Sequence, residues 1–387
     1  MRSFLPVPGM RAPALAFIAM SMVWAAFAAQ VPVLKAQIGA TDAVFGAVFV
    51  VSSLGAIGSM WIAPLVDRSL GAWSVAACSA AMALGFLVAV QAGSVWVFGL
   101  AMICIAAASG LCDILMNTRV SELEARDGRA LMSLNHALYS FGYAGVALVT
   151  GFAREAGWGP KEIYAVVSGL ILVMCLMMRA PHSHVAGEGV GIQLARPGGL
   201  VWLGGLIVLA ALFAESAGEG WSALLIEREL GGGAADGALG PALLGLMMGV
   251  GRLFGHVLSR RFADTRLIGL ACLTASAGAV SAALAYTPLM AQAGFALMGF
   301  GVSLVVPLAM GIVGRSVAPT GRVRALARVS AIGYGAFMIG PAVLGGVAQA
   351  VSLSASFMLV GAVLFSVGLL LVPALARTVA SGGAARP

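Results

Sequence analysis

The sequence predicts an all-α membrane protein of twelve transmembrane helices, divided into two halves of six. Of its 387 residues, 61% are hydrophobic and 10% are charged, whereas a soluble domain usually carries about 25% charged residues. Such a chain has too few charged groups to cover a surface that faces water, whereas apolar side chains can face the lipid of a membrane. Its 52 glycines fit the close helix contacts of membrane bundles.

The predicted helices are apolar runs of about 20 residues, the length that crosses a bilayer. In the first half they cover 11–32, 43–64, 71–91, 95–119, 131–152 and 160–179. In the second half they cover 199–221, 239–258, 267–287, 289–313, 325–348 and 353–375. Short connectors near Gly93 and Pro288 predict antiparallel hairpins.

The longest polar interruption separates helices six and seven. We therefore predict an N-terminal bundle at 1–180, a cytoplasmic linker at 181–198 and a C-terminal bundle at 199–387. The two halves also show weak internal similarity, because helices two and eight each lead into a charged turn. We assign a structural or gating role to the charged residues of these segments, which are Asp67, Arg68, Arg252 and Asp264.

Basic residues predict the orientation, because they concentrate on the cytoplasmic side. With a cytoplasmic N-terminus, the outward segments hold four of the 22, which are Lys35, Arg154, Lys161 and Arg228. Both termini are thus expected in the cytoplasm. The net charge of +7 lies in short connectors without interleaved aromatics, so no nucleic-acid partner is expected.

The sequence contains no pattern typical of an enzyme, a cofactor site or a metal site. All five cysteines fall inside apolar runs without a CxxC pair. The linker residues His182 and His184 have no further ligands nearby. No Walker loop is present, which argues against an ATP-driven pump.

Polar residues inside helices four and five are the first functional candidates, since an ionisable group at mid-bilayer costs about 3 kcal/mol. Asp113 and Asn117 are four residues apart and share a helix face. Asn135, His136 and Tyr139 begin helix five, at similar depth in an adjacent antiparallel helix. We predict proton coupling by Asp113 with His136, and solute binding by the others. The alternative is a hydrogen-bonded clamp that fixes the inner ends of both helices.

Helix seven carries Glu215 and Glu219 on one face, followed by Trp221. Arg252 on helix eight is expected about 10 Å nearer the cytoplasm, so no direct ion pair with Glu215 is expected. We predict that Glu215 faces a wet cavity and binds protons or solute, and that Glu219 and Trp221 bind solute. The alternatives are an interhelical hydrogen bond of protonated Glu215 and a solvated helix end at Glu219.

Two further features lie in helices one and eleven. Gln30, near the end of helix one, is assigned to solute binding, with helix packing as the alternative. Gly333, Gly340 and Pro341 on helix eleven are interpreted as a moving seam, with tight packing as the alternative.

The chain resembles the major facilitator superfamily (MFS), and within it a fucose-permease-like branch with a YbjJ-like group. The resemblance rests on the stretches DILMN from Asp113, ELEARDGRALMSLNHALYSFGYAG from Glu122, ESAGEGWSALL from Glu215, GVGRLFGHVLSRRFAD from Gly249, GFGVSLVVP from Gly299 and IGYGAFMIGP from Ile332. They occur in both halves in the order of the family.

This resemblance implies an MFS fold of two six-helix bundles around a central cavity, alternating access by rocking, and a location in a bacterial inner membrane. In the sugar permeases of this branch an acid on helix four takes part in proton coupling, and Asp113 matches it. Their acid on helix one has no match near Gln30. The YbjJ-like pattern has a basic residue where Gln30 stands and an acid where Gly220 stands, so solute preference is expected to differ.

We therefore predict a monomeric secondary transporter, without cofactor, that couples a small polar solute such as a sugar or organic acid to protons. One alternative is an exporter of drugs or metabolites with an apolar cavity, which the 19 methionines make worth testing. The other is a membrane sensor that transports nothing.

Overall fold

The computed structural model describes residues 9–128, 131–179, 198–259, 261–317 and 321–384. The described residues of the first half form α1 (Arg11–Gln37), α2 (Asp42–Leu70), the short helix η1 (Gly71–Trp73), α3 (Ser74–Ala89), α4 (Val95–Asp127), α5 (Met132–Glu155) and α6 (Pro160–Cys175). The predicted linker falls almost wholly outside the described residues.

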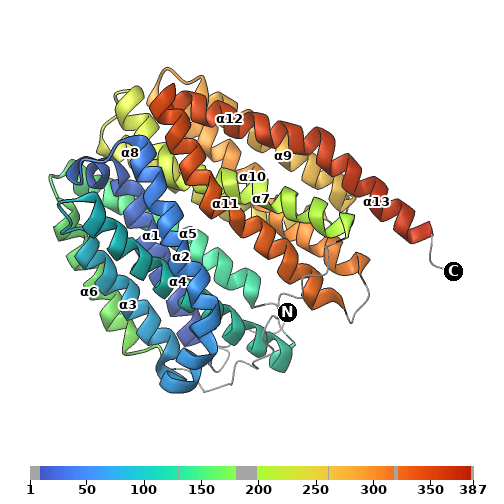
Figure 1. Cartoon of the computed structure of the whole chain (residues 1–387), viewed down its shortest axis with the longest axis horizontal. Coiled ribbons are helices and arrows are strands. Elements are labelled where there is room, and N and C mark those ends of the chain that lie inside the picture. Colours follow the sequence, from blue (N-terminus) through green and yellow to red (C-terminus); the bar gives the residue numbers. More distant parts are fainter. Residues whose placement is uncertain (1–8, 129–130, 180–197, 260, 318–320, 385–387) are drawn as a thin grey trace. The chain divides into compact units, whose positions relative to one another are not determined.

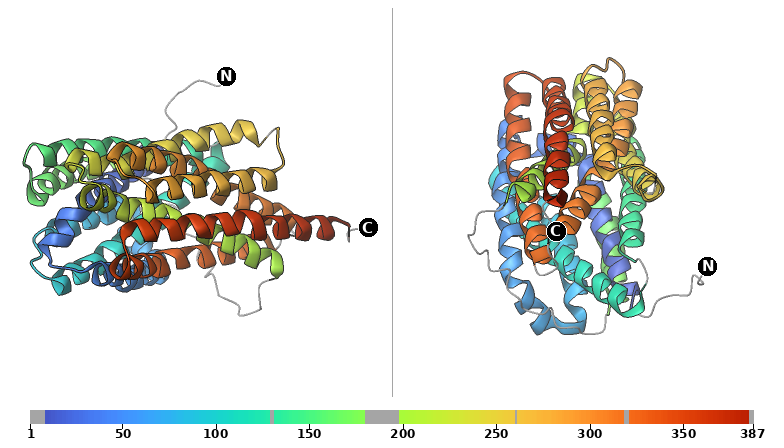
Figure 2. Two further views of the ribbon diagram at one scale, coloured as in Figure 1. Left: turned by 90° about the horizontal axis from the view of Figure 1, so that it is seen from above. Right: turned by 90° about the vertical axis from the view of Figure 1, so that its right-hand side faces the viewer.

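The second half forms α7 (Gly199–Leu224), η2 (Leu225–Glu229), α8 (Ala234–Leu258), α9 (Asp264–Ala283), α10 (Pro288–Ser316), α11 (Arg322–Ala350), α12 (Leu353–Ser366), η4 (Val367–Leu371) and α13 (Val372–Ala384). Figure 2 shows α12, η4 and α13 running as one rod toward the C-terminus. Each of the twelve predicted spans coincides with helix.

Nine segments of the described residues are long and apolar enough to cross a membrane. One of them, Asp42–Ala89, contains both α2 and α3. The helices α5 and α6 are not among the nine; α6 has only 16 residues, and α5 begins with polar side chains.

Capping side chains start the helices after the short connectors. Ser94 accepts a hydrogen bond from the Val97 amide and so begins α4. Thr287 does the same for Met290 at the start of α10, where Pro288 occupies the first turn. Each cap satisfies a donor that helical bonding leaves free, and α3–α4 and α9–α10 pack against each other. The two predicted hairpins are confirmed.

The chain divides into two compact units. The N-terminal unit comprises Met1–Thr41 and Val48–Gly187, and the C-terminal unit comprises Asp42–Ala47 and Glu188–Pro387. In the first, α3 packs on α4 and α6, and α5 packs chiefly on α1 (Figure 1). In the second, α10 packs on α9 and α8, and α11 on α7. The expected contact between α4 and α5 is present, but α1 rather than α4 is the main packing partner of α5.

Glycines let helices of the C-terminal unit approach closely. A β-carbon at Gly301 of α10 would overlap the Ala275 amide of α9, and one at Gly333 of α11 would lie 2.5 Å from Val208 Cγ1 of α7. A β-carbon at Gly340 would lie 3.0 Å from the Phe213 ring. Tight packing at Gly333 and Gly340 is thus observed, while movement along this seam stays a prediction.

Gly301→Ala is expected to lower the free energy of unfolding by about 1–3 kcal/mol, the usual cost of overpacking. Gly99→Ala in α4 is the matched control, since a β-carbon there meets nothing within 4 Å. Thermal unfolding of both variants in the same detergent measures the difference. Equal stability of the two would contradict the close α9–α10 approach.

Glu124 joins the end of α4 to the start of α5. Its carboxylate accepts hydrogen bonds from the amides of Leu131 at 2.6 Å and Met132 at 2.8 Å, while Gly128 ends α4 with a positive φ of 63°. Glu124→Ala is expected to cost about 1 kcal/mol, as for other lost helix caps. Hydrogen exchange should accelerate at Leu131 and Met132, and Glu124→Gln, which keeps an acceptor, should restore much of the protection. Unchanged exchange in the alanine variant would refute the capping role.

Candidate functional site

Asp113 and Asn117 form a hydrogen-bonded pair on one face of α4. The Asn117 amide nitrogen donates to Asp113 Oδ1 at 2.9 Å and to the Asp113 carbonyl oxygen at 2.8 Å. Both side chains are half-buried. The predicted sharing of one face is confirmed, and Asn117 holds the carboxylate in a fixed orientation.

The polar start of α5 lies against α1. The His136 ring makes an edge contact with Phe17, at 5.1 Å between ring centres, and the Tyr139 ring lies 6.0 Å from that of Tyr143. Asn135 is fully buried and donates to the Leu131 carbonyl at 2.8 Å. The contact of His136 with Phe17 joins α5 to α1, whereas the other two contacts are local to the start of α5. The pairing of Asp113 with His136 stays a prediction.

Two buried amide oxygens in the N-terminal unit have no hydrogen-bond partner among the described residues. They are Gln30 Oε1 and Asn135 Oδ1. Gln30 is fully buried, and its amide nitrogen donates to the Ala26 carbonyl at 3.2 Å within α1. An unsatisfied buried acceptor costs about 1–3 kcal/mol, so each oxygen is suited to accept a hydrogen bond from a polar solute.

Arg154, which the sequence does not identify as a site residue, lies near Gln30. Its guanidinium donates to the Ala29 carbonyl of α1 at 2.6 Å. The apolar pattern predicts an outward loop at Arg154, but α5 continues to Glu155. This longer helix brings a positive charge beside the α1 segment that contains Gln30.

In the C-terminal unit, Glu215 of α7 and Arg252 of α8 form an ion pair. Arg252 Nη2 lies 3.9 Å from Glu215 Oε1, so the expectation of no direct pair is wrong. The first of the two helices runs on through η2 to Glu229, well past the predicted end at 221. The depth of Glu215, counted from Glu229, and the depth of Arg252, counted from Ala234, differ by about four residues, or about 6 Å. An arginine side chain can span this distance.

Glu219 lies one helical turn after Glu215 on the same face of α7, so its carboxylate adds a second negative charge beside the ion pair. All three side chains are half-buried. One guanidinium therefore faces two carboxylates inside a helix bundle. Trp221, in contrast, is 2% exposed and makes an edge contact with Phe45 at 5.9 Å, so its assignment to solute binding stays a prediction.

A second class of charged contact occurs at corresponding places in the two units. Arg119, about two turns before the end of α4, donates to buried Asp67 at 2.5 Å, and Ser74 adds a hydrogen bond at 3.0 Å. Arg315 at the end of α10 pairs with Asp264. The partners are 52 and 51 residues apart.

The sequence does not identify Arg119 and Arg315 as partners of these carboxylates, since both belong to the basic residues that are expected on the cytoplasmic side. The matching separations in the two halves were the available signal. Arg68 is exposed.

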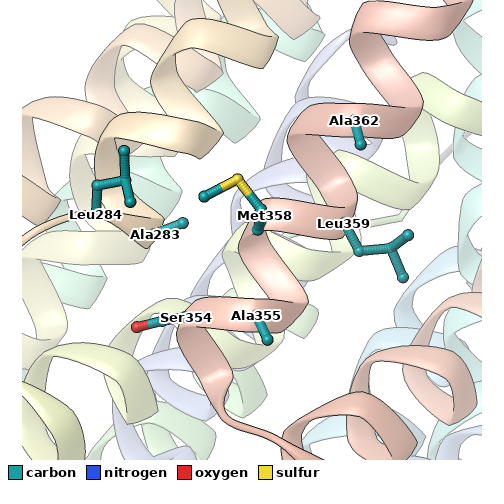
Figure 3. Close-up of a pocket in the computed structure, with 7 residues that line it drawn as sticks. All are labelled: Ala283, Leu284, Ser354, Ala355, Met358, Leu359 and Ala362. Carbon is teal, nitrogen blue, oxygen red and sulfur yellow. The ribbon is translucent and has the colours of Figure 1, made fainter.

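A shallow groove of about 380 Å³ lies beside α12 and the end of α9 (Figure 3). Figure 3 shows Met358 pointing across it toward Ala283. Ser354 is its one polar lining side chain, and its hydroxyl donates to Glu229 at 2.7 Å. None of the predicted site residues lines it, and its apolar lining is typical of a lipid-facing surface.

The chain is similar to known membrane transporters over most of its length. The family model of the Major Facilitator Superfamily matches residues 14–291 and 226–386. An uncharacterized MFS-type transporter of Yersinia pestis is 29% identical over 360 residues, covering 91% of this chain and 92% of the relative. The membrane protein MosC of Rhizobium meliloti is 26% identical over 354 residues, covering 91% and 86%.

Solved structures agree on the fold. A D-xylose-proton symporter superposes with a TM-score of 0.74 at 15% identity, covering 94% of this chain and 96% of that one. A bacterial homologue of the human lysosomal transporter Spinster gives 0.69 at 15% identity, covering 96% and 97%. The predicted fold class is confirmed, and this family consists of transporters rather than enzymes. The chain belongs to the major facilitator superfamily and is a multi-pass membrane transporter of a small molecule.

Proposed function

We propose that the chain is a secondary active transporter that moves a small polar solute, of the sugar or organic acid class, together with protons by alternating access. The cluster of Glu215, Glu219 and Arg252 carries this proposal. The Arg252 guanidinium carries one positive charge, whereas Glu215 and Glu219 carry two negative charges when both are ionised. The three side chains together then have an excess negative charge. A half-buried excess charge is costly unless it gains a proton or a cationic partner.

The N-terminal unit supplies the second part of the proposal. Asp113 is the proton-coupling acid, held by Asn117, and His136 exchanges the proton with it. Gln30 and Asn135 offer buried acceptor oxygens to the solute, and Tyr139 binds it from α5. Glu215 takes part in both proton and solute binding.

The chain acts as a monomer in a bacterial inner membrane with both termini in the cytoplasm, and it belongs to the fucose-permease-like branch and its YbjJ-like group. The distribution of lysines and arginines supports the orientation. Coupling requires binding sites that open to each side in turn. Two titratable clusters, one in each unit, suit such a mechanism.

A thermal-shift screen of purified protein tests the solute class. The probes are D-xylose, L-fucose, lactate, succinate and the dye ethidium, because a ligand that binds the native state raises the unfolding temperature. A sugar or organic acid should stabilise the parent, and Glu215→Gln should weaken that stabilisation. Stabilisation by ethidium alone would support the exporter alternative instead, and no response to any probe would contradict the proposal.

A further inference from the structure

The helix α1 carries a proline in its interior. Pro32 lies within the helix Arg11–Gln37, and proline has no amide hydrogen to donate to the carbonyl four residues earlier. The Ala28 carbonyl therefore loses its helical donor, and the proline ring crowds the same carbonyl. Since this turn of α1 has fewer backbone hydrogen bonds than its neighbours, it needs support from outside the helix to keep one conformation.

Arg154 of α5 supplies such support. Its Nη1 donates to the carbonyl oxygen of Ala29, the residue after Ala28, at 2.6 Å. A hydrogen bond from a charged donor is stronger than one between neutral groups. Ala28 is 2% exposed and Ala29 is 0% exposed, so water has little access to replace the guanidinium. Side chains of neighbouring helices commonly stabilise a membrane helix that contains proline, and Arg154 has this geometry.

The contact lies at the end of a continuous seam between α1 and α5. Phe17 meets His136 through their rings, and a β-carbon at Gly142 would lie 2.6 Å from Ser21 Oγ. Because these contacts advance along both helices together, α1 and α5 run in the same direction. Both helices belong to the N-terminal unit, so the place of Arg154 beside α1 is defined within that unit.

Gln30 lies in the weakened turn, between Ala28 and Pro32. Its side chain is fully buried, and its Nε2 donates to the Ala26 carbonyl at 3.2 Å. Its Oε1 has no hydrogen-bond partner among the described residues. Because the Gln30 side chain is bonded to a carbonyl of its own helix, a change in the backbone of this turn moves the acceptor oxygen.

We propose that Arg154 is a positioning residue, which holds the turn of α1 that Pro32 weakens and thereby keeps Gln30 Oε1 oriented toward the solute. The guanidinium acts through the Ala29 carbonyl rather than through a contact with the solute. The role of Gln30 in this inference rests on the proposed function. The support of the turn depends neither on the identity of the solute nor on protons.

A double-mutant cycle between Arg154 and Pro32 tests the support of the turn without a solute. Hydrogen exchange of a peptide covering residues 28–37 is followed by mass spectrometry in lipid nanodiscs. The peptide includes Val33, whose helical acceptor is the Ala29 carbonyl. Arg154→Ala should speed the exchange about tenfold. Pro32→Ala restores the missing amide donor, and in that background Arg154→Ala should change the exchange by less than about threefold.

Further variants separate this hydrogen bond from a general effect of charge. Lys161→Ala removes a positive charge from the exposed first turn of α6, and it should leave the exchange of the peptide unchanged. Arg154→Lys keeps a charged donor and should retain part of the protection. Arg154→Gln, which removes the charge, replaces Arg154→Ala if the alanine variant fails to fold, and the same difference between the two backgrounds is expected.

Thermal-shift titration with D-xylose, L-fucose, lactate and succinate measures the effect on the solute site. Arg154→Ala and Gln30→Ala should each weaken the affinity for the stabilising probe about tenfold. The double variant should bind no more weakly than either single variant, since Arg154 acts through Gln30. Arg154→Lys should recover part of the affinity. Additive losses would show that Arg154 contributes independently of Gln30 and would overturn the positioning role.

Faster exchange in Arg154→Ala that is largely absent in the Pro32→Ala background, with Lys161→Ala unchanged, supports the inference. Equal acceleration in both backgrounds, or no acceleration in either, would overturn it. A failed solute screen with this difference between the backgrounds intact would count against the proposed solute class and leave the support of the turn by Arg154 standing.

Discussion

Asp113→Asn is expected to abolish uphill solute uptake while leaving exchange between equilibrated pools. Asparagine keeps the shape of the side chain and an acceptor for Asn117, whose amide lies 2.9 Å from the carboxylate. It cannot bind or release a proton. Exchange requires only that the loaded transporter reorients, whereas uphill uptake requires the proton to be released on the other side.

Proteoliposomes with the solute identified by thermal shift measure both modes. Asp113→Glu is the control, because it retains a titratable carboxylate, and it should keep some uphill uptake. If Asp113 acts only as a clamp, the asparagine variant should lose stability, and both modes should decline together. Uphill uptake that survives in Asp113→Asn would refute the coupling role.

Arg119→Ala is expected to lower the free energy of unfolding by about 3–5 kcal/mol, the usual cost of leaving a buried charge without its partner. Arg119 is 4% exposed and Asp67 is 1% exposed, so water cannot replace the lost guanidinium. Ser74 would remain as a hydrogen-bond donor to Asp67. The carboxylate would then stay buried after the loss of its charged partner.

Arg126→Ala provides the matched control. Arg126 pairs with Asp127 at 2.7 Å, but its side chain is 54% exposed, and exposed pairs contribute only about 0–1 kcal/mol. Unfolding of both variants in one detergent gives the comparison. The double variant Asp67→Asn with Arg119→Gln should recover part of the loss, because it removes both charges. Equal stability of Arg119→Ala and Arg126→Ala would show that burial does not govern this pair.

The fold could be predicted because hydropathy and length determine where a helix crosses lipid. All twelve predicted spans coincide with helix, and the caps at Ser94 and Thr287 lie where the short connectors required them. The pairing of Asp113 with Asn117 was also predictable, since residues four apart share a helix face. These features depend on local sequence alone.

Contacts between helices could not be predicted in the same way. The pair of Glu215 with Arg252 depends on where the helix of Glu215 ends, and the apolar run gave an end at 221 whereas helix continues to Glu229. A charged residue can extend a helix beyond the hydrocarbon, so hydropathy underestimates its length. For the same reason, the hydropathy pattern predicts a loop at Arg154, although the helix continues past it.

Which helices pack against each other depends on the shapes of both surfaces, and the sequence of one helix alone does not determine it. The polar start of α5 was expected beside α4, but α5 packs chiefly on α1. The seating of Asp42–Ala47 in the C-terminal unit likewise depends on glycines some 300 residues away, such as Gly345. Hydropathy does not identify those glycines as one side of a contact.

The most direct test of proton coupling is solute accumulation in proteoliposomes driven by an imposed pH gradient alone. The parent should concentrate the solute above its external level, and an external pH dye should report proton uptake in step with the solute. Glu215→Gln and Asp113→Asn should each abolish both signals. Equal accumulation with and without the gradient, or solute movement without proton uptake, would contradict the account.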